Sequence, residues 1–85
     1  MNESIDTKIR SVALNFRKIR EYRNYTQEYL AMKLGISQNA YSKIELGYTR
    51  ITLERLIQIS HILDVDTVDL LSADAEDLVR LQTTK

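Results

Sequence analysis

Residues 26–47 have the sequence TQEYLAMKLGISQNAYSKIELG, in which two short segments with helical apolar spacing are separated by a glycine. Thr26 and Ser37 suit the N-caps of two helices, because a hydroxyl oxygen accepts a hydrogen bond from a backbone N–H that has no partner within the helix. Gly35 and Gly47 suit the ends of these helices, because glycine adopts the left-handed backbone without steric cost. The stretch therefore predicts two short helices that meet across a tight turn.

The second of these helices has one apolar face and one polar face. At 100° per residue, the side chains of the apolar face are Ala40, Tyr41 and Ile44. Those of the opposite face are Gln38, Asn39, Ser42 and Lys43. Asn and Gln amides can pair with adenine and a lysine ammonium can donate to guanine, so these side chains could read base edges. Because any surface helix turns polar residues outward, this face alone leaves the choice of function open.

The remainder of the chain is also predicted to be helical. It has no proline, only two glycines and no alternating strand pattern. Apolar spacing predicts a first helix over about residues 8–23, while Thr52 and Asp66 suit the caps of a fourth and a fifth helix. The fourth helix has a wide apolar arc, which predicts burial on more than one side: Leu53, Leu56, Ile57, Ile59, Ile62 and Leu63. The expected fold class is all-α, a compact five-helix bundle followed by a short C-terminal tail or helix.

Length and composition exclude several classes of function. A chain of 85 residues is expected to form one domain with one core, since domains usually have roughly 100–200 residues. It has no cysteine and a lone histidine, His61, and therefore no disulfide framework, thiolate nucleophile or histidine cluster. No enzymatic activity, cofactor or metal is expected. Because no apolar run is long enough for a membrane span or a signal core, the expected location is cytoplasmic.

The charge of the chain is unevenly distributed. The net charge is zero, but residues 1–50 carry nine basic and five acidic side chains, a net charge of +4. Residues 51–85 carry three basic and seven acidic side chains, a net charge of −4. A polyanion would be attracted by the first half and repelled by the second, which would orient its approach. An accidental imbalance in a neutral protein remains the alternative.

Seven segments have the residues and spacing of one known family: RKIREYRNYTQE at 17–28, LA at 30–31, LGISQ at 34–38, IELG at 44–47, TLERL at 52–56, ILDVD at 62–66 and LL at 70–71. Together they resemble the helix-turn-helix domain of the phage repressor and Cro class, the Xre-type family. The resemblance covers about residues 9–72, with an N-terminal arm at 1–8 and a C-terminal tail at 73–85. It implies that a helix over about 26–34 crosses the DNA backbone and that a recognition helix over about 37–46 lies in the major groove.

The resemblance also implies roles for single side chains. Gln38, Asn39 and Lys43 match positions that contact base edges. Positions suited to phosphate contacts are Thr26, Gln27, Ser37, Ser42, Tyr48 and Arg50. For Thr26 and Gln27 this role has a physical basis, because free N–H groups and the helix dipole favour an anion at a helix N-terminus.

Arg20 and Glu45 match a pair that in similar domains links the first helix to the end of the recognition helix. If this ion pair forms, it fixes the angle of the recognition helix. The competing role for Arg20 is a direct phosphate contact.

Four positions depart from the family pattern. Asp64 replaces the usual glycine after the fourth helix, which is tolerable because Asp enters the left-handed region more readily than most residues. Leu46 replaces a frequent polar or basic residue and puts one usual phosphate contact in doubt. Ile51 replaces a frequent proline and could rest on the core or on a partner subunit. Tyr41 replaces an aliphatic core residue, so we expect it to pack inside with its hydroxyl reaching the rim.

The C-terminal part has more apolar residues than a terminal segment needs. Similar proteins usually bind as two-fold dimers, so we expect an isologous interface made by helix five and a tail helix starting near Asp74. Its predicted residues are Val68, Leu71, Leu78 and Leu81. The alternative is that the tail folds over its own core.

The expected function is a sequence-specific regulator of transcription that binds double-stranded DNA as a homodimer on an inverted repeat. Phage-type repressors, restriction–modification controllers and toxin-neutralising autoregulators share this architecture, and the sequence does not separate them. The alternative is a protein-interaction module of the same fold, whose polar face binds a partner protein alone or in addition to DNA.

Overall fold

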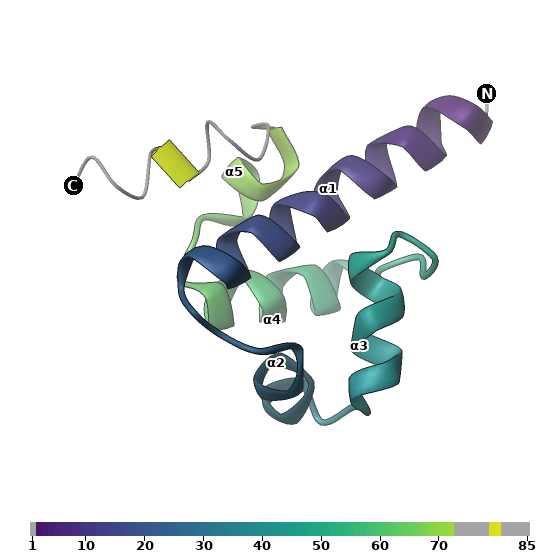
Figure 1. Cartoon of the computed structure of the whole chain (residues 1–85). Coiled ribbons are helices and arrows are strands. Elements are labelled where there is room, and N and C mark those ends of the chain that lie inside the picture. The colour runs from purple at the N-terminus through teal and green to yellow at the C-terminus, as the bar shows by residue number, and fades with distance from the viewer. Residues whose placement is uncertain (1, 73–78, 81–85) are drawn as a thin grey trace.

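The structure is a computed structural model that describes residues 2–72 and 79–80, with side chains from residue 4 onward. Five helices follow one another within residues 2–72, and the described residues contain no strand (Figure 1). They are α1 (Asn2–Tyr22), α2 (Gln27–Leu34), α3 (Gln38–Glu45), α4 (Leu53–Leu63) and α5 (Thr67–Ser72). The prediction of an all-α, five-helix fold is confirmed, while the tail helix expected near Asp74 falls outside the described residues.

The first helix is longer than the sequence predicted. Apolar spacing indicated a start near residue 8, but α1 begins at Asn2, so the segment expected to be an arm is helical. Figure 1 shows these first turns projecting past the rest of the molecule. The prediction was wrong because it relied on apolar residues facing the core, whereas residues 4–8 are exposed or half-buried and need no such pattern.

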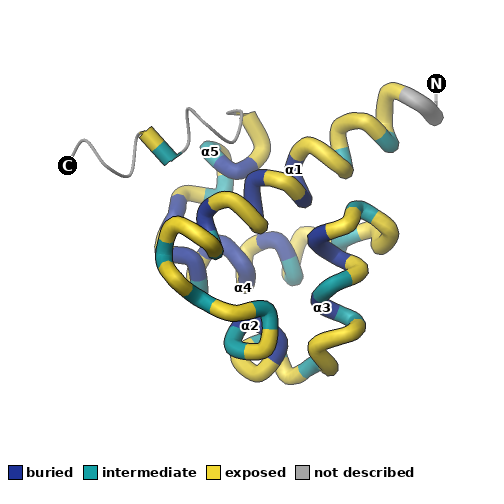
Figure 2. Tube along the Cα trace, viewed as in Figure 1, coloured by how far each residue is buried: buried dark blue, intermediate teal, exposed yellow. Residues whose placement is uncertain are grey.

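All five helices contribute to one hydrophobic core. The largest apolar or aromatic side chains that are fully buried are Phe16, Ile19, Leu30, Tyr41, Ile59, Leu63 and Leu70. Figure 2 shows the buried positions facing inward along each helix. Because burying one such side chain contributes about 1.5–3 kcal/mol, the shared core fixes the positions of α2 and α3 relative to α1 and α4.

The fourth helix is buried on one side only. Leu56, Ile59 and Leu63 face the core, but Leu53 and Ile57, which belong to the same apolar arc, are exposed. The prediction of burial on more than one side was therefore wrong. Its physical reason is that α1, α2 and α5 cover a single face of α4, so the opposite apolar stripe stays at the surface of the described chain.

The predicted helix caps are confirmed. Thr26, Ser37 and Thr52 have extended backbones, and their hydroxyl oxygens accept hydrogen bonds from N–H groups three residues later, at 3.0, 3.0 and 3.1 Å. Gly35 ends α2 with φ 72°, and Asp64 ends α4 with φ 55° in the place where similar domains have glycine. These caps set the starts of α2, α3 and α4 and the ends of α2 and α4.

Polar side chains of α1, and that of Arg23 directly after it, hold the carbonyl ends of two other helices. The Arg23 Nε donates to the carbonyl oxygen of Leu63 at the end of α4, at 2.7 Å. The buried Asn15 amide donates to a carbonyl oxygen of α5 at 2.8 Å, and the Lys8 ammonium donates to the next one, that of Leu71. These bonds satisfy carbonyl groups that have no partner within their own helix. They join α5 to α1, and α4 to the turn that follows α1.

Candidate nucleic-acid interface

The helices α2 and α3 form a helix-turn-helix. Gly35 and the residue after it donate their backbone N–H groups to the carbonyls of Met32 and Ala31, at 3.1 and 3.0 Å. These two hydrogen bonds end α2 at a left-handed glycine. The chain then turns toward Ser37, which caps α3. The two helices contact each other more extensively than any other pair, so α3 is presented on a rigid support.

The polar face predicted for α3 is exposed. Gln38, Asn39 and Lys43 are open to solvent, whereas Tyr41 and Ile44 are buried. The helix therefore exposes two amides and one ammonium, while its opposite side is packed in the core. Ser42 is half-buried beside this row, and Ser37 is exposed while its hydroxyl caps α3.

The N-terminus of α2 has the geometry of an anion site, but one of its two predicted side chains is already engaged. Thr26 is exposed and its hydroxyl caps the helix. The Gln27 Nε2 donates to Glu45 Oε1 at 3.0 Å, so this amide contributes to holding the end of α3. A residue with an expected phosphate role thus also has a structural one, which the sequence pattern did not indicate.

Arg20 and Glu45 join α1 to the end of α3. Arg20 Nε lies 2.7 Å from Glu45 Oε2, Arg20 Nη2 lies 3.1 Å from Glu45 Oε1, and Arg20 Nη1 donates to the Tyr25 carbonyl at 2.8 Å. The side chains of Arg20 and Glu45 are 12% and 2% exposed. The hydrogen bond to Glu45 raises the pKa of Arg20 above its ordinary value, so the guanidinium stays charged. Because each guanidinium nitrogen of Arg20 donates a hydrogen bond inside the protein, Arg20 has few donors left for a phosphate.

The Tyr41 hydroxyl is buried and does not reach the rim. It has no hydrogen-bond partner among the described residues, so that part of the prediction was wrong, although the ring packs in the core as expected. Burial, followed by the nearby Glu45 carboxylate, raises the pKa of Tyr41 well above its usual range. The phenol therefore stays neutral beside the ion pair.

The loop after α3 carries one basic and one aromatic side chain outward. Arg50 is exposed, and its Nη2 lies 3.4 Å from Asp6 Oδ1 of α1. Tyr48 is exposed, and so is Leu46 at the end of α3. Ile51, for which the sequence left two possibilities, packs partly buried against the core of its own chain.

A shallow hollow of about 420 Å³ lies beside α3 and contains no carboxylate among its lining residues. Its basic residues are Lys43, Arg50 and Arg55. The sequence reasoning missed Arg55, whose Nη1 also donates to the Leu34 carbonyl at the end of α2, at 3.3 Å. The signal that could have identified Arg55 is its position one turn after the Thr52 cap, at the start of a helix that packs against α2.

The predicted dimer residues are only partly described. Val68 and Leu71 are 66% and 39% exposed on α5, while Leu78 and Leu81 lie outside the described residues. Val79, between these two, packs partly buried against the core. No described helix has the length and hydrophobicity needed to cross a membrane.

Comparisons with known proteins agree with this geometry. A helix-turn-helix family model matches residues 16–70, which include all of α2, α3 and α4. An uncharacterized HTH-type transcriptional regulator, YqaE of Bacillus subtilis (strain 168), is 40% identical over 65 residues, which cover 76% of this chain and 56% of that protein. The chain thus spans little more than half of the length of this curated relative. No solved structure gives a significant match. Because the family model matches residues 16–70 and α2 and α3 have the helix-turn-helix geometry, the chain belongs to the helix-turn-helix family of the Xre/Cro type.

Proposed function

We propose that this chain is a sequence-specific, double-stranded DNA-binding regulator of transcription that reads the major groove with α3. The observation that carries the proposal is the exposed row of Gln38, Asn39 and Lys43 beside a hollow that has basic and no acidic lining residues. Amides and an ammonium are the groups that recognise base edges, and a carboxylate-free surface lets a polyanion approach. The family and the name of the Bacillus relative support the same function.

The phosphate contacts of the proposed complex lie on both sides of α3. On one side, Thr26 and Gln27 present the N-terminus of α2, whose free N–H groups and dipole favour an anion. On the other side, Tyr48 and Arg50 extend from the loop after α3. Ser37 and Ser42 supply hydroxyls between these two places. Contacts of this kind position the protein on DNA, while α3 supplies the sequence preference.

We further assign the chain to a homodimer that binds an inverted repeat. One α3 spans only a few base pairs, and a two-fold dimer would place two such helices one DNA turn apart, about 34–36 Å. Val68 and Leu71 offer exposed apolar surface on α5, and Leu78 and Leu81 would extend it. Sedimentation equilibrium of the intact chain at micromolar concentration tests this point, and a monomeric mass would contradict it.

Selection from random duplex DNA at about 0.15 M salt tests the function, because non-specific attraction is weak there. The proposal expects enrichment of an inverted repeat with half-site centres about 10 bp apart. A matched selection with the Asn39→Ala, Lys43→Ala double variant controls for the face that reads the bases, and it should lose the enriched motif while the protein stays folded.

Failure of a folded wild-type sample to enrich any sequence would contradict the proposal and favour a protein-interaction module. The two functions also differ in salt dependence. Each phosphate contact makes log K fall with log salt by about 0.9, whereas a mainly apolar protein interface shows little slope.

A further inference from the structure

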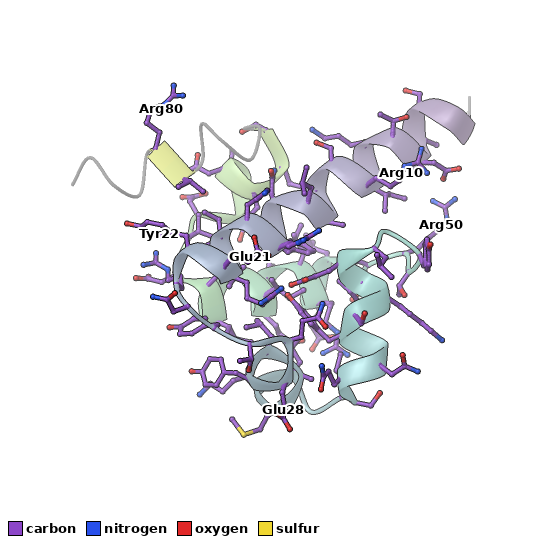
Figure 3. All side chains as sticks on the ribbon, in the orientation of Figure 1. Arg10, Glu21, Tyr22, Glu28, Arg50 and Arg80 are labelled. Carbon is purple, nitrogen blue, oxygen red and sulfur yellow. The ribbon has the colours of Figure 1, made fainter. Side chains whose placement is uncertain are left out.

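The projecting first turns of α1 meet the loop after α3 at two points. Asp6 Oδ1 accepts a hydrogen bond from Arg50 Nη2 at 3.4 Å. One helical turn later, the aliphatic stem of Arg10 rests on Gly47, since a Cβ added to that glycine would lie 2.8 Å from Arg10 Cγ. Asp6 and Arg10 share one face of α1 because they are four residues apart. Figure 3 shows Arg10 and Arg50 at the same end of the molecule.

Two guanidinium groups and one carboxylate therefore gather at this end. Arg10 is exposed, and within the described part of the chain no carboxylate lies within ion-pairing distance of its guanidinium. The side chains of Arg50 and Asp6 are 71% and 45% exposed, so their ion pair adds little to stability. The group keeps one uncompensated positive charge and is held by a contact that a stronger anion can replace.

We propose that Arg10 and Arg50 form a two-guanidinium site for a phosphate of the DNA backbone, which the Asp6 carboxylate partly occupies in the unbound protein. This inference rests on the proposed DNA-binding function. Arg10 lies before residue 16, where the match to the helix-turn-helix family model begins, so that match covers only the Arg50 half of the site. Guanidinium groups donate in a planar fork that fits phosphate oxygens, which makes phosphate the matching ligand.

The position of the site relative to α3 supports this assignment. Arg50 also lines the carboxylate-free hollow that contains Lys43 and Arg55. The Arg10–Arg50 site therefore continues a basic surface that starts beside α3 and ends on α1. A DNA backbone leaving the groove along the loop would meet Arg10 after Arg50, and the Asp6 carboxylate would then lose its partner.

The experiment measures the affinity for the selected duplex against salt for the wild type and three variants. Arg10→Met removes the charge but keeps an unbranched stem over Gly47, Arg10→Lys restores the charge, and Arg17→Met is the matched control. Arg17 is an exposed arginine of the same helix, paired with Glu21 at 3.1 Å. Arg10→Met should make the fall of log K with log salt shallower by about 0.9. The loss of affinity should therefore be about eightfold greater at 0.1 M salt than at 1 M, and it should be the same for specific and random duplexes. Arg10→Lys should restore most of the slope.

Asp6→Asn gives the opposite expectation, because it frees Arg50 and removes a negative charge facing DNA. Binding should become tighter, and unchanged or weaker binding would overturn the role of Asp6. Two results would overturn the phosphate site although the wild type still binds its duplex. One is an Arg10→Met variant with the salt slope of the wild type, and the other is an equal loss of affinity in Arg10→Met and Arg17→Met. A wild type without a salt slope would overturn the proposed function itself.

Discussion

The outward faces of α4 and α5 differ in chemistry from the outward face of α3. α3 buries its apolar side chains and exposes two amides and an ammonium, and its end is fixed by the Arg20–Glu45 pair. The outward faces of α4 and α5 instead expose Leu53, Ile57, Val68 and Leu71. The polar surface suits a wet, charged ligand such as DNA, whereas the apolar surface suits another protein surface. The difference fits the two binding faces proposed above, one for DNA and one for a second copy of the chain.

The largest expected effect is the loss of the ion pair that fixes α3. Glu45→Ala would leave the Arg20 guanidinium without its carboxylate in a partly buried place, at a cost of about 3–5 kcal/mol. The melting temperature should fall by more than about 10 °C, as measured by circular dichroism. Glu54→Ala on the exposed start of α4 is the control, and equal melting temperatures for the two variants would count against the pair.

A smaller effect distinguishes the two glycines that flank α3. Gly35→Ala places a side chain at φ 72° with nothing within 4 Å, so only the left-handed strain of about 1–2 kcal/mol applies. Gly47→Ala has the same kind of strain at φ 78° and adds a contact with Arg10. We expect a total loss of about 2–4 kcal/mol for Gly47→Ala, including the cost of crowding. Urea unfolding checks the order, and equal losses for the two variants would show that Arg10 does not rest on Gly47.

The polar face is tested by base preference. Asn39→Ala or Lys43→Ala should cost about 1–3 kcal/mol of binding to the selected duplex and relax the preference at one or two base positions. Arg50→Ala should weaken binding to all duplexes alike, because the contact proposed for Arg50 is with phosphate. Competition binding with single-base variants of the site measures both, and a uniform loss from Asn39→Ala would show that another face reads the bases.

The smallest expected effect concerns the apolar face of α5. Val68→Asp places a charge in the proposed dimer interface and should raise the dimer dissociation constant by at least about tenfold, or 1.4 kcal/mol. Met32→Asp, at another exposed apolar position on α2, is the matched control and should leave the dimer intact. Sedimentation equilibrium decides between them, and equal masses for the two variants would place the interface elsewhere.

Local signals in the sequence predicted most of the helices. Thr26, Ser37 and Thr52 are caps because a hydroxyl competes well for a free N–H, and Gly35 and Asp64 end helices because their backbones enter the left-handed region. The family pattern identified Arg20 and Glu45, which lie together although they are 25 residues apart.

The sequence could not predict features that depend on tertiary neighbours. The first turns of α1 have no buried apolar side chain among their described residues, and the exposure of Leu53 depends on which helices cover α4. The hydrogen bond from Gln27 to Glu45 spans 18 positions of the chain, and the contact of Asp6 with Arg50 spans 44. No local pattern exists for either. The buried Tyr41 hydroxyl follows from the depth of the core at α3.

The most direct test of the central claim is an NMR titration of the isotope-labelled chain with the selected duplex, in which the amide shift of each residue is followed. If α3 reads the bases, the largest changes fall on the start of α2, on residues 37–43 of the α3 region and on the loop at 47–50, with small changes at Val68 and Leu71. Changes concentrated on the outward faces of α4 and α5, with α3 unaffected, would contradict this claim.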